Sequence, residues 1–403
     1  MEIAAVICEC NPFHSGHAAL FSAIRKQLGS ETAIVAIMSG NYVQRGEPAI
    51  LRKEARAVCL LRGGADLVLE LPFPHAAAGA ERFAGAGVSL VTRLGCVDVL
   101  AFGSEGGTTE ELCILASRLE KTEFRDKFSS VPISSPLGCA QKTEAVYREV
   151  YGSDRYLSLL AKPNQMLGCE YIRALGRLKS SILPLAIPRV AEKESSNDAL
   201  LFSAGIARTQ IRTDFSSGIL RLPSYTRPIL TEEWRTGRAP VSFDAILPYY
   251  LIYYRLVLDD TLQPYDGMKG GLAARICRAA NLTSTKDAFF EALRTKKYTD
   301  AYLRRALLYG FFRITRQELN APPAFTRILA LNDRGKRILA IARKRATIPI
   351  LNRPAEIHRL DKSAKDLADK SIRADAVYSG LMPRPTAPAD NFRHTPLVSF
   401  DEG

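Results

Sequence analysis

The sequence predicts an α/β protein whose first half forms a Rossmann-like doubly wound parallel sheet and whose second half is mainly α-helical. Two observations support this prediction. Short apolar segments alternate with amphipathic ones over the first 120 residues, and most of the loops after them are polar or glycine-rich. Near-continuous apolar strands separated by single helices are typical of parallel sheets covered on both faces. Such sheets bind ligands at the carboxyl ends of their strands, which is where we expect the functional site.

The apolar segments have strand length, and the segments between them repeat apolar residues at helical spacing. The strands are expected at Ile3–Glu9, Ala33–Met38, Asp66–Leu71, Val97–Phe102 and Ile182–Ile187. The helices of the first half are expected at His17–Leu28, Arg52–Arg62, Gly79–Arg93, Thr109–Leu119 and Asn164–Leu178, with another starting near 206–212. Further helices are expected at Leu247–Leu258, Leu272–Ala280, Lys286–Leu293, Asp300–Phe312 and Arg334–Ala346.

These patterns divide the chain of 403 residues into three parts: a sheet domain over 1–215, a helical region over 216–383 and a loosely held tail over 384–403. The tail is rich in proline and polar residues, which favours weak ordering. No apolar run reaches the ~18 residues of a membrane span, and the N-terminus lacks the positive region of a signal peptide. The eight cysteines form no C-x-x-C pair, so we expect a reducing cytoplasm and no metal held by the protein.

The positive charge lies entirely in the second half. Residues 1–200 contain 22 basic and 22 acidic side chains, whereas residues 201–403 contain 33 basic and 20 acidic ones, a net charge of +13. This asymmetry favours contact with a polyanion, although a merely soluble basic surface is the alternative.

The loop after the first strand carries the strongest motif. It reads Glu9-Cys10-Asn11-Pro12-Phe13-His14-Ser15-Gly16-His17 and opens the first helix. Main-chain N–H groups at a helix start attract phosphates, and a glycine allows the chain to approach closely. His14 and His17 can donate hydrogen bonds to phosphate oxygens, which stabilises the charge of a departing pyrophosphate. The alternatives are a turn cap with a packed histidine, or a zinc site, for which no third ligand lies nearby.

Two other loops at the same sheet edge add candidates. After the second strand, Lys53 and Arg56 share one helix face and are candidate phosphate contacts, or else surface side chains. After the fourth strand, Gly103 begins a Gly-Ser-Glu-Gly-Gly turn in which the main chain is expected to meet an adenine or a ribose.

Taken together, these stretches resemble the tRNA(Met) cytidine acetate ligases, which belong to the H-x-G-H nucleotidyltransferase superfamily. The stretches are Glu9–His17, Ser39–Ala49, Gly64–Pro72, Phe102–Glu105 and Pro163–Tyr171. The resemblance implies that ATP is held by the end of the first strand and the start of the first helix, and by three later residues. These residues are Ile7, Cys8, Glu9, Cys10, Asn11, Pro12, Phe13, His14, Ser15, Gly16, His17, Ala18, Ala19 and Leu20, with Gly103, Asn164 and Arg189.

The sequence departs from the family pattern in two places. Cys10 replaces an aromatic residue, which changes packing but removes no phosphate donor. The second phosphate motif of the superfamily is present only as Thr209-Gln210-Ile211-Arg212, with Arg208 where a small residue is expected. Thr209 and Arg212 are therefore further candidate phosphate contacts.

The resemblance implies an ATP-dependent ligase. It would form acetyl-adenylate from acetate and ATP, with Mg²⁺, and acetylate N4 of the wobble cytidine of elongator tRNA(Met). Charge density assigns tRNA binding to Lys336, Arg337, Arg343, Lys344 and Arg345, or else these residues form a solvated helix face. Two rival functions remain open at this point: a nucleotidyltransferase that makes a dinucleotide-type cofactor, and a tRNA-binding protein without catalysis. The first rival leaves the basic second half unexplained.

Overall fold

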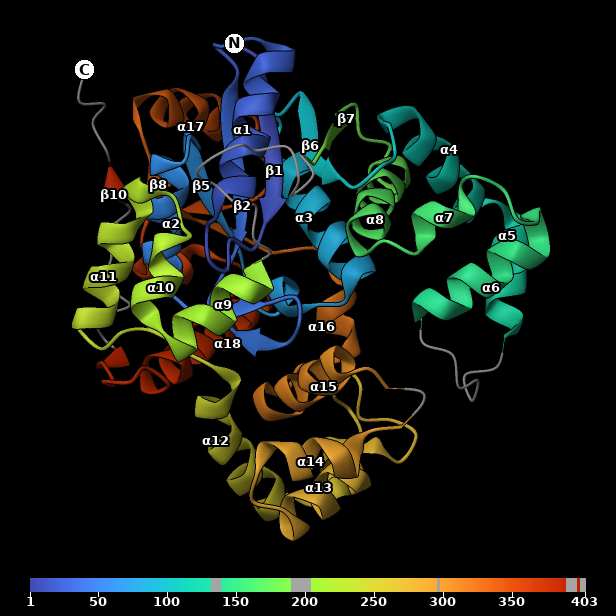
Figure 1. Ribbon diagram of the computed structural model, residues 1–403, viewed down its shortest axis with the longest axis vertical. Helices are drawn as coiled ribbons and strands as arrows, with labels where there is room; N and C mark the ends of the chain where they lie inside the picture. The colour runs from blue at the N-terminus through green and yellow to red at the C-terminus, as the bar shows by residue number, and fades with distance from the viewer. Residues whose placement is uncertain (132–138, 190–203, 296–297, 389–396, 399–403) are drawn as a thin grey trace.

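A mostly parallel, eight-stranded β-sheet forms the centre of the protein (Figure 1). The computed structural model describes residues 1–131, 139–189, 204–295, 298–388 and 397–398. The strand order is β10-β8-β5-β2-β1-β6-β7, with β9 paired to β8, and a separate hairpin joins β3 to β4. The strands are β1 Ile3–Cys8, β2 Ala33–Ser39, β3 Tyr42–Val43, β4 Glu47–Pro48, β5 Leu67–Leu71, β6 Val99–Ser104, β7 Leu183–Pro188, β8 Thr326–Leu331, β9 Ile350–Leu351 and β10 Leu397–Val398.

Helices cover both faces of the sheet. Those up to residue 235 are α1 Ser15–Leu28, α2 Lys53–Arg62, α3 Ala80–Leu94, α4 Thr109–Glu120, α5 Thr122–Ser130, α6 Cys139–Tyr151, α7 Leu157–Leu160, α8 Pro163–Arg177, α9 Ala204–Thr213, α10 Phe215–Leu220 and α11 Arg227–Arg235. The later ones are α12 Phe243–Leu256, α13 Leu272–Leu282, α14 Lys286–Leu293, α15 Asp300–Phe312, α16 Arg316–Asn320, α17 Asp333–Arg345 and α18 Lys362–Gly380. Short 3₁₀ turns are η1 His75–Ala77, η2 Ser224–Thr226, η3 Asp259–Leu262 and η4 Pro354–Arg359. The predicted strands are confirmed with ends that differ by at most two residues, and the predicted helices are confirmed as well.

The central strand β1 shows why the sequence forms a doubly covered sheet. All six of its residues are buried. Ile3, Ala5 and Ile7 belong to the core that includes α3 and α8, whereas the alternate residues pack in the core that includes α1 and α2. Side chains alternate across a strand, so a strand covered on both faces has to be apolar at every position.

The C-terminal region is mainly helical, as predicted, but it also contributes strands to the sheet, which was not predicted. β8 lies in the region predicted to be mainly helical, yet it pairs antiparallel with β5, from Leu67–Leu331 to Leu69–Ile328. β10 then pairs parallel with β8 inside the predicted tail, most of which lies outside the described residues. The sheet therefore contains strands from beyond the predicted boundary at residue 215.

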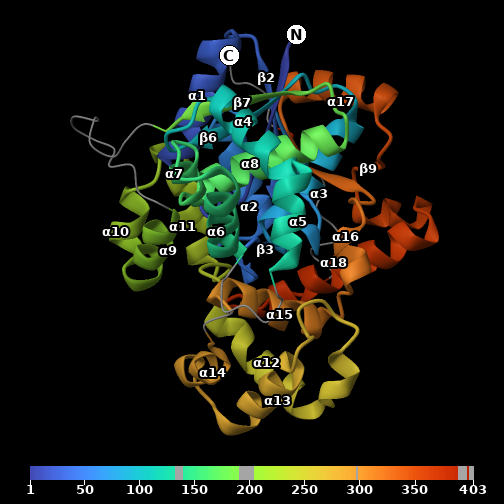
Figure 2. The same ribbon diagram turned by 90° about the vertical axis from the view of Figure 1, so that its right-hand side faces the viewer.

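Helices α12 to α15 form a lobe at one end of the molecule, away from α1 and α17, as Figures 1 and 2 both show. Its buried residues include Tyr250, Ile276, Phe290 and Leu307, and they belong to the same core as the sheet face that α3 covers. Among the helices of the described residues, none is long and apolar enough to cross a membrane.

Candidate active site

The carboxyl end of β1 lies at the point where the strand order reverses. β1 pairs in parallel with β2 on one side and with β6 on the other. The connection after β1 leads to β2 on one side of it, whereas the connection after β6 leads to β7 on the other side. Doubly wound sheets bind ligands at such a point. The loop from Glu9 to His14 and the end of β6 at Ser104 therefore border the expected crevice.

His14 and His17 are held together at the start of α1. His14 is the N-cap residue, and its Nδ1 accepts a hydrogen bond from the Gly16 N–H at 3.1 Å. The Nδ1 of His17 accepts from the His14 N–H at 3.2 Å, and the two ring centroids lie 4.0 Å apart. Because both Nδ1 atoms accept, each neutral ring carries its proton on Nε2. Both imidazoles therefore offer an Nε2–H donor.

Burial keeps both imidazoles neutral. The pKa of His14 is lowered to about 4, first by burial and then by the positive charges of Arg189 and Arg208. The pKa of His17 is lowered well below its usual value by burial, and further by His14 and Arg189. The fixed positive charge at this loop therefore comes from the two arginines, while the imidazoles supply neutral donors.

Three distant segments meet beside the histidines. Nη1 of Arg189, at the end of β7, pairs with Oε1 of Glu105 at 2.9 Å, and Asn164 of α8 donates to the same oxygen. The Arg189 N–H donates to the Ser104 carbonyl at 2.8 Å, which fixes the arginine against the end of β6. The structure thus brings Asn164 and Arg189 together, although 25 residues separate them in the chain.

Two glycines allow Arg189 and His14 to approach this closely. A Cβ at Gly103 would lie 3.3 Å from Cγ of Arg189. A Cβ at Gly16 would lie 2.9 Å from Cε1 of His14 and 4.0 Å from Nη2 of Arg189. Gly103, predicted from the loop after β6, and Gly16, predicted from the loop after β1, therefore border the same arginine.

The hairpin of β3 and β4 packs against the other side of this loop. Its Gln44 N–H donates to Oε1 of Glu9 at 2.7 Å, and Arg305 of α15 donates to the Gln44 carbonyl at 3.1 Å. Burial raises the pKa of the Glu9 carboxyl, and its hydrogen bond with Gln44 opposes that shift. The helical lobe is in this way connected to the loop after β1.

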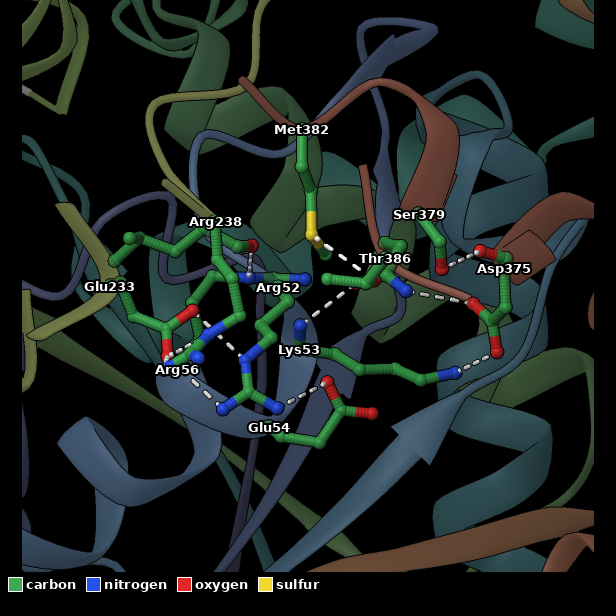
Figure 3. Close-up of polar contacts among 12 residues, drawn as sticks. Arg52, Lys53, Glu54, Arg56, Glu233, Arg238, Asp375, Ser379, Met382 and Thr386 are labelled. Atoms are coloured by element: carbon green, nitrogen blue, oxygen red, sulfur yellow. Dashed lines mark hydrogen bonds and ion pairs between the residues drawn. The ribbon is translucent and has the colours of Figure 1, made fainter. Parts of the chain in front are cut away.

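Lys53 is a correction to the sequence analysis, because it is neither a phosphate contact nor a surface side chain. It is buried, and its Nζ bonds to Glu70 at 2.7 Å and to Asp375, as Figure 3 shows in part. Arg327 of β8 pairs with Glu70 at 2.9 Å and with Asp375 at 3.3 Å. Lys53 thus belongs to a buried ion-pair network that joins α2 and β5 to the C-terminal region.

Arg56 is a second correction. Its side chain is fully buried and donates to the carbonyls of Leu51 at 3.0 Å, of Glu9 at 2.6 Å, and of Gly40. These bonds use three of its five N–H groups and hold the guanidinium inside the protein rather than at the surface. Arg56 instead ties the loop after β1 to the loop after β2.

The degenerate second motif lies on α9, and its role as a phosphate contact stays a prediction. Thr209 and Arg212 are exposed on α9, where Thr209 bonds to the Gly205 carbonyl and Arg212 to the Val241 carbonyl at 3.5 Å. Arg208, which sequence reasoning treated only as a departure, donates to the Asn11 carbonyl at 2.7 Å. Its position directly before Thr209 was the one signal that could have identified it.

The basic cluster on α17 lies at the amino ends of the strands, opposite the carboxyl ends where His14 lies. Asn332, which caps α17, bonds to Asp66 just before β5, and Arg345 packs against Gly95, which precedes β6. Both contacts are at the amino ends of the strands, and Figure 1 shows α17 beside the N-terminus. A six-residue strand such as β1 spans roughly 20 Å, so this cluster is about that far from the edge with His14. Its exposed members are Lys336, which pairs with Asp333, and Arg337, Arg343, Lys344 and Arg345.

The chain matches the family model described as HIGH Nucleotidyl Transferase over residues 1–391. It is 32% identical over 393 residues to a tRNA(Met) cytidine acetate ligase of Acetivibrio thermocellus, which covers 94% of each chain. It is 34% identical over 347 residues to the protein of that name from Caldicellulosiruptor saccharolyticus, 84% of each chain.

Solved structures of similar fold are known. Thermotoga maritima TmcAL, bound with alpha-thio ATP, superposes with a TM-score of 0.91 at 28% identity, covering 99% of this chain and all of that one. The apo form of the same protein gives the same values. The similarity therefore extends over the sheet, the helical lobe and the C-terminal return to the sheet.

Proposed function

This chain belongs to the family of tRNA(Met) cytidine acetate ligases, and we propose that it uses ATP to join acetate to the wobble cytidine of elongator tRNA(Met). The product is N4-acetylcytidine. Reaction with a tRNA would take place in the cytoplasm.

The first step activates acetate. An acetate oxygen attacks the α-phosphorus of ATP, the bond to the β-phosphate breaks, and acetyl-adenylate and pyrophosphate result. The Nε2–H groups of His14 and His17 donate to the oxygens on which charge develops, where such donors contribute most to rate. Arg189 supplies positive charge beside them, and Mg²⁺ accompanies the ATP phosphates as part of the substrate.

The nucleotide is held by the segments that meet at the end of β1. Gly16 and the first turn of α1 present main-chain N–H groups to the phosphates. Gly103 and Asn164 border the side of the crevice formed by β6 and α8. Arg189 pairs with Glu105 in the protein alone and exchanges that partner for phosphate when ATP binds.

The second step transfers the acetyl group. The N4 amine of the cytidine attacks the acetyl carbon, the bond to AMP breaks, and one N4 proton is released. AMP is a far better leaving group than the oxide that acetate alone would have to expel. The cytidine has to leave its stack to reach the adenylate, which single-stranded anticodon loops permit.

The observation that carries the proposal is the convergence of His14, His17, Gly103, Asn164 and Arg189 at the point where the strand order reverses. Acetate-dependent exchange of labelled pyrophosphate into ATP, without tRNA, tests the first step. We expect exchange with acetate and none without it. Exchange that is independent of any carboxylate would reject acetate activation.

A further inference from the structure

Helices α9, α10 and α11 are attached to the loop that holds the nucleotide. Arg208 of α9 donates to the Asn11 carbonyl at 2.7 Å, and the Ile50 N–H donates to Oδ1 of Asn11 at 2.8 Å. Ile50 in turn accepts from the N–H of Val241, which follows α11. One residue of the loop after β1 thus connects the nucleotide site to this group of three helices, which lie together in Figure 1.

The group presents an aromatic pair at its surface. Phe215 of α10 and Trp234 of α11 stack with ring centroids 4.2 Å apart and an interplanar angle of 17°. Trp234 is 37% exposed, although indole is among the side chains that gain most from burial. A narrow apolar hollow beside the pair is lined by Ile50, Ile211, Leu230 and their neighbours. The stacked rings line this hollow together with Ile50, whose N–H donates to Asn11 of the loop after β1.

The segment that carries the aromatic pair has a net positive charge. Residues 204–241 contain six arginines and three acidic residues. Glu233 is buried between Arg52 and Arg238, as Figure 3 shows, and the other two acids cap α10 and pair with Arg235. Arg212 and Arg221 are exposed on the same group of helices. The acidic charges are thus bonded within the group, and its surface carries an excess of guanidinium.

We propose that Trp234 and the exposed arginines around it form a platform for single-stranded RNA, on which a base next to the reacting cytidine stacks. Aromatic rings interleaved with cations bind unstacked bases and their phosphates. The platform is attached at the carboxyl ends of the strands, where the adenylate forms. The basic face of α17 lies at the amino ends of the strands. This inference rests on the proposed function, since it assigns the site of the RNA loop that delivers the cytidine.

Trp234 is the only tryptophan of the chain, so its fluorescence reports on the platform directly. Titration of the full-length protein with an anticodon stem-loop RNA should quench this fluorescence to saturation. A blunt duplex of the same length, which offers no unstacked base, should leave it nearly unchanged. Absence of quenching at RNA concentrations that saturate binding by another method would overturn the platform, and so would equal quenching by the duplex.

Substitutions give a second test that does not depend on fluorescence. Trp234→Ala should raise the Kd and the KM for tRNA about tenfold, and Trp234→Phe should keep most of the affinity because it retains a stacking ring. Tyr249→Ala removes an exposed aromatic ring of α12 outside the platform and is the matched control. Arg212→Gln should lower the salt slope of binding by about 0.7. Thermal unfolding shows whether each variant is folded, and the wild-type titration decides the question if Trp234→Ala is not.

The two proposals fail in different ways. If the wild-type protein acetylates no nucleoside of bulk tRNA, the proposed function fails. If it acetylates tRNA while a folded Trp234→Ala variant keeps the wild-type KM for tRNA, only the platform fails.

Discussion

Two main-chain N–H groups determine how the histidines of the H-x-G-H motif work. Gly16 and His14 each donate to an Nδ1 atom, and the rings are therefore fixed as Nε2–H tautomers before any nucleotide arrives. Donors that are already oriented need no rearrangement when charge develops in the transition state. At the scale of single residues, the motif is thus a pair of preorganised neutral donors.

His17→Ala should reduce acetate-dependent ATP–pyrophosphate exchange at least ~30-fold, which corresponds to the loss of ~2 kcal/mol of transition-state stabilisation. The melting temperature should fall by only a few degrees, because one capping bond and the contact with Phe13 are lost. His17→Asn keeps an acceptor for the His14 N–H but has no Nε2–H, and should be as inactive. His358→Ala, at an exposed turn, is the control. Normal exchange by His17→Asn would show that the reaction does not need the Nε2–H donor of His17.

The exchange rate should be nearly constant between pH 6 and 8. Because the pKa of His14 is about 4 and that of His17 is also lowered, both rings are already neutral throughout this range. Activity should be lost only toward acid pH, where protonation of Nδ1 removes the acceptors of the two capping bonds. A rate that falls tenfold per pH unit above about 6.5 would instead indicate a catalytic imidazolium.

The places of His14, Gly16 and Gly103 at the ends of strands could be predicted from the sequence, whereas the contacts of Lys53, Arg56 and Arg208 could not. His14, Gly16 and Gly103 follow strands directly, so their position depends only on the order of strands and helices. Lys53 was predicted to be a phosphate contact, or else a surface residue, because its partner Asp375 is 322 residues away and no local pattern indicates such a pair. Arg208 was missed for the same reason, since its contact with Asn11 depends on tertiary packing.

At the scale of elements, α17 combines two roles. Ile338 and Ala342 pack into the core, and Gly335 lies against the Asp66 carbonyl, where a Cβ would be 2.0 Å away. Its other face exposes three guanidinium or ammonium groups in its last turn, and Lys336 and Arg337 near its start. That face lies at the amino ends of the strands, and we propose that it binds backbone phosphates of the tRNA outside the anticodon loop.

Replacing Lys336, Arg337, Lys344 and Arg345 together by Gln should weaken tRNA binding. Each lost phosphate contact lowers the slope of log affinity against log salt by about 0.7–0.9, so the slope should flatten by two or more units. Preference for the anticodon loop should persist, since phosphate contacts position the RNA without specifying it. ATP–pyrophosphate exchange, which needs no tRNA, is the control reaction. An unchanged salt slope would identify this face as merely solvated.

The strand β8 shows where reading one element at a time fails. The segment from Thr326 to Leu331 is short, apolar and surrounded by helical patterns, so its length and periodicity do not distinguish a strand from a helix turn. Its identity depends on the unpaired edge of β5, which lies 260 residues earlier in the chain. The parallel arrangement of β1, β2, β5 and β6, by contrast, follows from consecutive βα units and was predicted.

At the scale of the whole molecule, the two halves of the chain share one sheet. A chain truncated after Ser216 loses β8 and leaves Lys53 and Glu70 without Asp375 and Arg327. Breaking a buried ion pair costs about 3–5 kcal/mol, a large fraction of typical stability. We therefore expect the truncated chain not to unfold cooperatively in a thermal melt, while the full chain binds ATP without tRNA. Cooperative melting and ATP binding by the truncated chain would show that the first half folds alone.

The central claim is that this protein transfers acetate to cytidine through an adenylate. The most direct test incubates the full-length protein with ATP, Mg²⁺, labelled acetate and bulk tRNA, then digests the RNA and identifies the labelled nucleoside. We predict label in N4-acetylcytidine alone, with AMP and pyrophosphate released in amounts equal to the acetyl groups transferred. Unlabelled nucleosides, or label accompanied by ADP and phosphate in place of AMP and pyrophosphate, would contradict the claim.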